Sequence, residues 1–261
     1  MNVKDRLVVV TGGGSGIGEA LSRRFAWEGA ATVVVTDLDG DAAERVATDI
    51  GGIGLRLDVS DEEAVTTTIE SIESDHGPIG LLVNNAGIAT GGSVVVPTAL
   101  WQKPWDVNVM AHVYAIRAAL PGMLANGSGY ILSTVSAAGL LTNIGAAPYA
   151  VTKHAALALA EWVSMTYGKQ GIGVSALCPQ FVETPMLDLF GDVASQEWVR
   201  SVAITTDDVA DAVIEGLAEE RFLILPHPEV ETFFQNKAND YDRWLGGMRK
   251  LNEQLNNPQF D

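Results

Sequence analysis

The sequence predicts an α/β protein with a doubly wound parallel sheet of seven strands, helices on both faces and a C-terminal helical extension. Short β-branched runs alternate along the chain with longer stretches of helical periodicity. These runs are apolar without strict alternation, as is typical of strands buried on both faces of a parallel sheet. No Pro/Ser-rich linker or internal repeat divides the chain. We therefore expect one domain over residues 1–228, followed by an extension over residues 229–261.

The same patterns place the individual elements. Strands are expected at residues 7–10, 32–36, 55–59, 81–83, 130–133, 174–177 and 222–225. Helices are expected between them, with the clearest periodicity at residues 19–27, 61–74 and 155–167. In such a sheet, ligands bind beyond the carboxyl ends of the strands, where the winding reverses. The residues that follow each strand are therefore the candidates for function.

Composition and charge exclude several classes of function. Hydrophobic residues make up 47% of the 261 residues and charged residues 19%, as in an ordinary globular protein. The 16 basic and 33 acidic residues give a formal net charge of −17, which would repel nucleic acids and anionic membranes. The one cysteine, Cys178, forms no internal disulfide, and the first residues resemble neither a secretory signal nor a membrane span. We expect a cytoplasmic protein without nucleic-acid or membrane partners.

A glycine-rich turn follows the first strand. Residues 11–18 read TGGGSGIG and lead into the first helix. Glycines allow a tight turn and let backbone N–H groups approach a pyrophosphate at the positive end of a helix. Because the motif lies between a strand and a helix, it predicts a Rossmann-type dinucleotide site. The residues expected to bind the cofactor here are Gly12, Gly14, Ser15, Gly16, Ile17 and Gly18.

An acidic residue, Asp37, ends the second strand about 20 residues after the glycines. A carboxylate there accepts hydrogen bonds from the adenosine ribose hydroxyls and repels a 2′-phosphate. Neither Ser15 nor Leu38, which is expected to contact the cofactor beside Asp37, supplies the positive charge that a 2′-phosphate needs. Asp37 also suits a helix cap, but Asp39 suits that cap better. The predicted cofactor is NAD rather than NADP.

The third and fourth strands end in residues that suit the same site. Asp58, which is followed by Val59, is placed to accept a hydrogen bond from the adenine amino group. Asn85, Ala86 and Gly87 follow the fourth strand, where small residues let the backbone pass beside a ribose. Taken alone, each of these groups is more often ordinary turn chemistry.

Three further side chains are candidates for catalysis. Tyr149 and Lys153 stand four residues apart at the start of a helical stretch, which places both on one helix face. Such a pair is often no more than a surface contact. Ser136, however, lies just beyond the fifth strand, at the end of the sheet where the cofactor is expected.

In this combination the sequence resembles the short-chain dehydrogenase/reductase family, in its compact single-domain branch. The resemblance runs from about residue 7 to residue 225 and rests on the motifs at 11–18 and 84–87 with the single residues below. It implies a nicotinamide-dependent oxidoreductase of alcohols and ketones that forms a homo-oligomer. A tetramer is the expected assembly, and a dimer is the alternative. The catalytic tetrad that the resemblance implies is Asn108, Ser136, Tyr149 and Lys153. The further cofactor contacts that it implies come from Tyr149, Lys153, Pro179, Val182 and Thr184.

The chemistry of these side chains fits the implied roles. A tyrosine titrates near pH ~10, and both the Lys153 ammonium and the positive nicotinamide of the oxidised cofactor would lower the pKa of Tyr149. Tyr149 then takes the hydroxyl proton of an alcohol or donates one to a ketone. Ser136 would hydrogen-bond the substrate oxygen. In the family, the residue at Asn108 anchors a water through its carbonyl. The four histidines lack ligand spacing, so no metal site is expected.

The expected substrate pocket is apolar and suits a medium or bulky substrate. Its lining is predicted to be Ser136, Ala138, Ile144, Tyr149, Gln180, Phe181 and Met186. Gln180 stands where the family has a glycine after Pro179, so a larger side chain is expected near the substrate or cofactor. Cys178 is expected to be a small buried hydrophobe. By resemblance, residues 185–205 form a mobile substrate lid, which includes Phe190, Val193 and Trp198.

The C-terminal extension is longer than in many relatives. Apolar residues recur at helical spacing from Val230 to Leu255, which predicts an amphipathic helix interrupted near Gly246 and Gly247. Its aromatic face must pack on the domain, cap the pocket or contact a neighbouring subunit.

We therefore expect an NAD(H)-dependent oxidoreductase that interconverts a secondary alcohol and a ketone by hydride transfer, with Tyr149 as the general acid or base. The alternative is a 3-oxoacyl thioester reductase, against which Asp37 argues because biosynthetic reduction generally uses NADPH. A non-catalytic NAD-binding protein is a second alternative, which the intact set of Ser136, Tyr149 and Lys153 disfavours.

Overall fold

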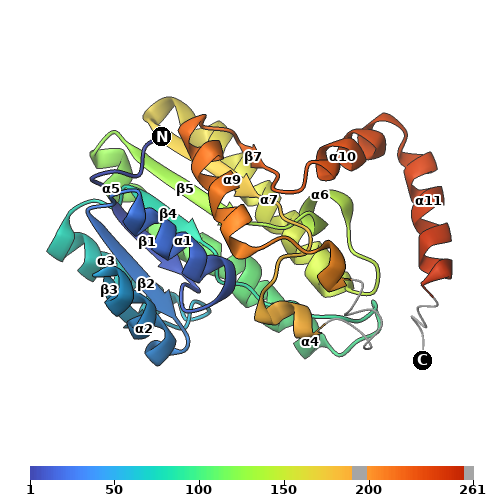
Figure 1. Cartoon of the computed structure of the whole chain (residues 1–261), viewed down its shortest axis with the longest axis horizontal. Coiled ribbons are helices and arrows are strands. Elements are labelled where there is room, and N and C mark those ends of the chain that lie inside the picture. Colours follow the sequence, from blue (N-terminus) through green and yellow to red (C-terminus); the bar gives the residue numbers. More distant parts are fainter. Residues whose placement is uncertain (190–198, 256–261) are drawn as a thin grey trace.

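The computed structural model of the chain describes residues 1–189 and 199–255 and contains a seven-stranded sheet. The strand order is β3-β2-β1-β4-β5-β6-β7, and every neighbouring pair is parallel. The chain builds the sheet outward from β1 and then outward from β4, so its winding reverses between these two strands. Figure 1 shows the strands between layers of helices. The predicted doubly wound α/β fold is confirmed.

The strands lie close to the predicted runs. They are β1 (Leu7–Thr11), β2 (Thr32–Asp37), β3 (Ile53–Arg56), β4 (Leu81–Asn84), β5 (Gly129–Thr134), β6 (Ile172–Leu177) and β7 (Leu223–Ile224). The strand predicted at 55–59 begins and ends earlier in the structure, at Ile53 and Arg56. It pairs only with β2, and β2 ends at Asp37, which lies opposite Arg56. The chain makes one more bond, from the Leu57 N–H to the Asp37 carbonyl, and then turns.

The helices connect the strands and extend past the last one. They are α1 (Gly16–Trp27), α2 (Gly40–Ile50), α3 (Glu62–His76), α4 (Thr98–Trp105), α5 (Ala111–Ala125), α6 (Ala138–Leu141), α7 (Ala147–Tyr167), α9 (Thr206–Ala218), α10 (Glu229–Asn239) and α11 (Tyr241–Gln254). A π-helical turn, Asp106–Met110, joins α4 to α5. The Asp39 carboxylate caps α2 by accepting from the N–H groups of Asp41 and Ala42, both at 3.1 Å, as the sequence predicted.

Two hydrophobic cores lie on opposite faces of the sheet. Val8 and Val10 of β1 belong to the core shared with α1, α2 and α9. Leu7 and Val9 belong to the core shared with α3, α5 and α7. Because successive strand residues point to opposite faces and both faces are covered, most positions within the strands are apolar, and the polar ones lie mainly at the strand ends. This explains why the strands read as continuous apolar runs.

The C-terminal extension consists of two helices rather than one. The predicted interruption near Gly246 and Gly247 was wrong, because both glycines lie inside α11. The break is at Asp240, whose carboxylate accepts from the Arg243 N–H at 2.9 Å and so caps the new helix. Glycine inside a helix costs only about 1 kcal/mol relative to alanine, so it does not by itself end one.

The two helices of the extension differ in how they pack. Val230 of α10 is buried in the core that the sheet shares with α3, α5 and α7. The buried Lys237 of the same helix donates its Nζ to the Leu140 carbonyl at 2.5 Å. In contrast, α11 has no buried residue. Figure 1 shows α11 at the periphery, joined to the body through α10. Of the expected lid, Phe190, Val193 and Trp198 lie outside the described residues. No helix among the described residues is long and apolar enough to cross a membrane.

The packing of α1 on the sheet predicts a stability effect. Phe25 is fully buried in the core of that face, so Phe25→Ala should lower the free energy of unfolding by about 3–5 kcal/mol. Trp27, on the same helix but 77% exposed, is the matched control, and Trp27→Ala should cost about 1 kcal/mol or less. Urea unfolding of the three proteins checks this. Equal losses from the two variants would contradict the packing described here.

Candidate active site

The glycine-rich turn is shaped by close backbone approaches. Gly12 and Gly16 have positive φ angles of +63° and +53°, a backbone conformation that residues with a side chain rarely adopt. A β-carbon on Gly12 would lie 2.8 Å from the Cα of Ala86, and one on Gly18 would lie 2.1 Å from the Gly12 carbonyl oxygen. Substitution at these positions would force the turn open. The motif therefore reflects the geometry of the turn as well as any ligand.

Asn85 joins the ends of three strands at this turn. Its Nδ2 donates to the carbonyls of Thr11 (3.1 Å) and Gly12 (3.0 Å), and its Oδ1 accepts from the Thr134 hydroxyl (3.1 Å). The Thr11 hydroxyl oxygen in turn accepts from the N–H groups of Asn85 (3.0 Å) and Ala86 (3.1 Å). The ends of β1, β4 and β5 are thereby held in one polar network.

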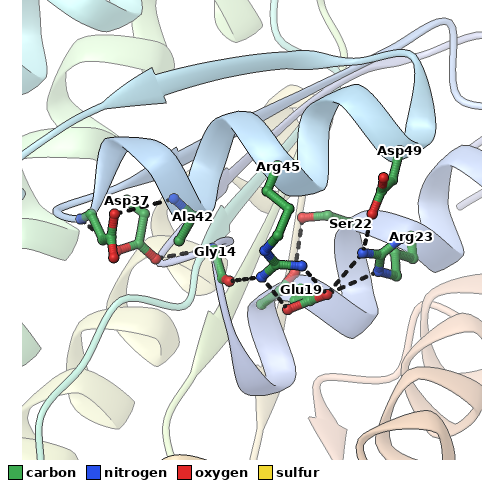
Figure 2. A network of polar contacts seen from close by, with 10 residues as sticks. Gly14, Glu19, Ser22, Arg23, Asp37, Ala42, Arg45 and Asp49 are labelled. Atoms are coloured by element: carbon green, nitrogen blue, oxygen red, sulfur yellow. Dashed lines mark hydrogen bonds and ion pairs between the residues drawn. The ribbon is translucent and has the colours of Figure 1, made fainter.

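The turn and the start of α1 fit a dinucleotide. Ser15 makes no capping hydrogen bond with its side chain, which leaves the N–H groups of the first turn for an anionic ligand. Asp37 contacts the turn directly, since its Oδ2 accepts from the Gly14 N–H at 2.9 Å and its Oδ1 from the Asp39 N–H at 3.0 Å. Figure 2 shows the Asp37 carboxylate beside Gly14, with Arg45 and Glu19 on the other side of that glycine. A pyrophosphate and an adenosine ribose suit these groups.

Asp58 is engaged locally. Its Oδ1 accepts from both the N–H (3.0 Å) and the hydroxyl (2.6 Å) of Ser60, and these bonds lower the pKa of Asp58. Asp58 and Val59 still line the same cleft as Asp37. The local bonds to Ser60 therefore leave Asp58 at the cleft, where its contact with adenine stays a prediction.

Ser136 lies just past β5 in a strained conformation. Its φ angle is +117°, outside the regions that non-glycine residues usually adopt. The hydroxyl accepts from the Ala138 N–H at 3.1 Å and donates weakly to the Pro179 carbonyl at 3.4 Å. The Ala137 N–H donates to the same carbonyl at 2.8 Å. These bonds tie the segment after β5 to the segment after β6.

Lys153 is buried within the same region, only 4% exposed. Its Nζ donates to the Thr134 carbonyl at 2.9 Å and lies 5.7 Å from the centre of the Tyr149 ring. Burial lowers the pKa of Lys153 to about 8. A β-carbon on Gly87 would lie 3.4 Å from this Nζ and 3.3 Å from the Asn108 Oδ1, so the glycine leaves room for both side chains.

Tyr149 differs electrostatically from the expectation. Burial raises the pKa of its phenol, and a hydrogen bond with the Ser136 side chain only partly opposes that rise. The Lys153 ammonium is directed at Thr134 rather than at the phenol. The predicted lowering of the Tyr149 pKa by Lys153 is therefore not present in this arrangement of the protein's own groups.

Asn108 lies in the π-helical turn between α4 and α5 and is fully buried. Its Nδ2 donates to the Ile88 carbonyl (3.0 Å) and the Thr152 hydroxyl (3.1 Å), while its Oδ1 accepts from the Ile88 N–H (2.8 Å). The side chain thus holds the segment after β4 against α7. Single π-helical turns inside α-helices are frequent at functional sites.

Nearly all predicted contact residues share one large cleft at the carboxyl ends of the strands. Every residue predicted to touch the cofactor or the substrate lines it, except Gly14 and Gly18, which lie within the turn, and the predicted tetrad lacks only Asn108 there. The structure therefore brings together groups that are far apart in the sequence. Cys178 is fully buried, and burial raises the pKa of its thiol to about 12, in agreement with a packing role.

The sequence did not reveal how the segment after β6 is held. His227 accepts from the Gln180 N–H through Nδ1 (3.1 Å), and its Nε2 pairs with the Phe181 carbonyl (3.1 Å). Burial lowers the pKa of His227, which favours the neutral ring that this pairing requires. The buried Nε2 of Gln180 has no hydrogen-bond partner among the described residues, and Gln180 lines the cleft.

The sequence left open whether the C-terminal extension caps the pocket, and it named no contact residues there; the structure supplies them. Phe233 and Asn236 of α10 and Arg243, Trp244 and Met248 of α11 line the cleft on the side away from the glycine turn. No local spacing signals this, because it depends on where the extension packs. Among the described residues, no three potential metal ligands gather at one place.

The burial of Lys153 predicts a pH effect on stability. Between its folded pKa of about 8 and its usual value of 10.5, the unfolded chain binds a proton that the folded chain does not. Stability should therefore rise with pH across this window through Lys153. Lys153→Met removes that contribution, so the variant's unfolding free energy minus the native value should fall from pH 8 to pH 10, by up to about 1.4 kcal/mol per pH unit. Parallel urea unfolding measures it, and a difference that is independent of pH would refute it.

Comparison with known proteins agrees with this geometry. The short chain dehydrogenase family profile matches residues 6–192. The 1-deoxy-11-beta-hydroxypentalenate dehydrogenase of Streptomyces exfoliatus is 34% identical over 253 residues, 92% of this chain and 90% of that protein. The meso-2,3-butanediol dehydrogenase of Serratia marcescens is 35% identical over 191 residues, 71% of this chain and 75% of that protein. A solved short chain dehydrogenase/reductase from Burkholderia phymatum in complex with NAD has a TM-score of 0.84 at 29% identity, covering 100% of this chain and 98% of that one. The chain belongs to the short-chain dehydrogenase/reductase family of oxidoreductases.

Proposed function

We propose that the protein is an NAD(H)-dependent dehydrogenase that interconverts a secondary alcohol and a ketone on a medium or bulky hydrophobic substrate. One observation carries this proposal. A single cleft holds Ser136, Tyr149 and Lys153 at one end and the Asp37 carboxylate at the other. The first three suit proton transfer at a carbinol, and the fourth suits an adenosine ribose without a 2′-phosphate.

The roles follow from the positions of the side chains. The nicotinamide cofactor, when bound, supplies the hydride chemistry. Tyr149 takes the hydroxyl proton of the alcohol, or returns it to the ketone, because its phenol lies in the cleft beside Ser136. Ser136 hydrogen-bonds the substrate oxygen, where negative charge develops. Lys153 carries its ammonium 5.7 Å from the centre of the Tyr149 ring and would hold the nicotinamide ribose, and Asn108 keeps the segment after β4 in place.

The substrate end of the cleft supports an apolar substrate with a polar group. Leu141, Ile144, Phe181 and Met186 line it together with the Gln180 amide. The hydroxypentalenate and butanediol dehydrogenases show by their names that relatives act on hydroxylated small molecules. Residence in the cytoplasm and assembly into a homo-oligomer stay predictions from the sequence.

Cofactor choice is the first test. NADH should bind at least about tenfold more tightly than NADPH, because the Asp37 carboxylate repels a 2′-phosphate. Titration of the purified protein with each dinucleotide, followed by nicotinamide fluorescence, measures the ratio. Asp37→Asn keeps the shape of the side chain without its charge. The variant should therefore bind NADH and NADPH with more similar affinities than the native protein does. Tighter binding of NADPH by the native protein would overturn the assignment of NAD.

Catalysis by Tyr149 is the second test. Tyr149→Phe removes the ionisable oxygen, and kcat on a secondary alcohol found by screening with NAD⁺ should fall about 10²–10⁴-fold. NADH binding should persist, since the ring remains. Tyr114→Phe is the matched control, because this tyrosine packs against the core outside the cleft. A Tyr149→Phe protein with the native rate would favour a different acid or base.

A further inference from the structure

A pair of charged side chains, Glu19 and Arg45, contacts the glycine-rich turn on the side opposite to Asp37. Arg45 of α2 donates through Nη1 and Nη2 to the two carboxylate oxygens of Glu19, both at 3.0 Å. The same Nη2 also donates to the Gly14 carbonyl at 2.9 Å. Figure 2 shows Arg45 reaching from α2 across to Glu19 on α1, with Gly14 beside it. We call this arrangement of Glu19, Arg45 and the Gly14 carbonyl the fork.

The fork and Asp37 hold the same residue of the turn. The Gly14 carbonyl is bound by Arg45, while the Gly14 N–H is bound by the Asp37 carboxylate at 2.9 Å. A β-carbon on Gly14 would lie 2.9 Å from both the Asp37 Oδ2 and the Ala42 Cβ. No space separates the turn from β2 and α2 here. A shift of Arg45 would therefore move Gly14 relative to the carboxylate that is expected to bind the ribose.

Glu19 keeps the guanidinium neutralised. It also accepts from the Nε (3.1 Å) and Nη2 (2.9 Å) of Arg23, which in turn binds Asp49 at 2.8 Å. Hydrogen bonding to Arg45 is the largest of the effects that hold the pKa of Glu19 below its usual range, so the carboxylate is charged at neutral pH. The negative charge of Glu19 offsets the field of the paired guanidinium and so weakens its attraction for another anion.

We propose that Glu19 is a positioning residue that holds Arg45 on the Gly14 carbonyl, and that this fork helps the protein to prefer a dinucleotide without a 2′-phosphate. The proposal rests on the proposed NAD(H)-dependent function and adds two residues to it. Arg45 lies one helical turn beyond Ala42, which packs on Gly14 beside Asp37. The guanidinium already contacts the carbonyl of Gly14, the residue whose N–H is bound by the Asp37 carboxylate.

We expect the fork to contribute little to the stability of the folded protein. The Arg45 side chain is 52% exposed and that of Glu19 is 24% exposed. An ion pair with a partner as exposed as Arg45 contributes little to folding. Its main consequence is therefore expected at the turn that it holds, where a change in cofactor affinity can be separated from a change in unfolding.

Two substitutions at the fork should both reduce the preference for NADH, but through different cofactors. Glu19→Gln frees the charge of Arg45 and should tighten NADPH binding by about fivefold, with NADH binding unchanged or weaker. Arg45→Met removes the donor to Gly14 and should weaken NADH binding by about fivefold, without any gain for NADPH. Fluorescence titration with both dinucleotides measures these affinities without reliance on turnover. Thermal unfolding of the cofactor-free variants shows whether they fold like the native protein.

Arg56 offers a matched control for loss of a positive charge. It ends β3, beside α2, and its side chain packs near Gly40 without a hydrogen bond to the turn. Arg56→Met should leave the ratio of NADH to NADPH affinity within twofold or so of the native value. Should Glu19→Gln fail to fold, Glu19→Asp retains the charge but shortens the arm, and it should shift the ratio toward NADPH by a smaller factor.

The outcomes separate this inference from the function on which it rests. Native protein that binds neither dinucleotide, or prefers NADPH, would remove the proposed cofactor before any variant is considered. Native protein that prefers NADH, together with fork variants that leave the ratio unchanged, would overturn the fork alone. Equal effects of Arg45→Met and Arg56→Met would also overturn it, because general charge rather than the fork would then explain the change.

Discussion

The hydrogen bonds of the Asn85 side-chain amide are the interactions on which the rest of the site depends. This amide binds the carbonyls of Thr11 and Gly12 and the hydroxyl of Thr134, and so ties the ends of β1, β4 and β5 together. The Thr134 carbonyl then receives the Lys153 ammonium. One chain of hydrogen bonds thus runs from the glycine turn to the predicted catalytic lysine. It forms only because the strands are parallel, which places their carboxyl ends at one edge of the sheet.

The burial that stabilises the fold also sets the electrostatics of the site. Burial lowers the pKa of Lys153 to about 8 and raises the pKa of Tyr149. Burial also lowers the pKa of His112 to about 3, so this ring on α5, whose nitrogens have no hydrogen-bond partner in the part of the chain that the structure describes, stays neutral. Ser136 adds a strained φ angle beside these groups. Such local penalties persist only where surrounding structure enforces them, and here the two cores on either side of the sheet supply that stability.

The two ends of the cleft are built on different principles. At the glycine turn, the contacts are with backbone groups whose positions follow from the sheet, and Asp37 and the fork hold one residue from both sides. At the other end, the walls come from the segment after β6 and from α10 and α11, of which α10 packs on the body through a buried valine and a buried lysine. Connecting segments and terminal helices generally tolerate sequence change better than the strands of a buried sheet do. Recognition of the common cofactor and choice of substrate can therefore change separately.

The sequence alone determined the fold class, the strands of the sheet and a set of contact residues of which nearly all line the cleft, because these depend on local patterns of apolar residues, glycines and caps. Only the tertiary structure decided the rest. The end of β3 depended on its partner β2, and the break at Asp240 depended on a cap that outweighs two glycines. The roles of His227 and of the Asn108 side chain, and the grip of Arg45 on Gly14, join residues 20 to 47 positions apart. Such contacts are set by how helices and strands pack, and no spacing along the chain encodes that packing in a form that can be read locally.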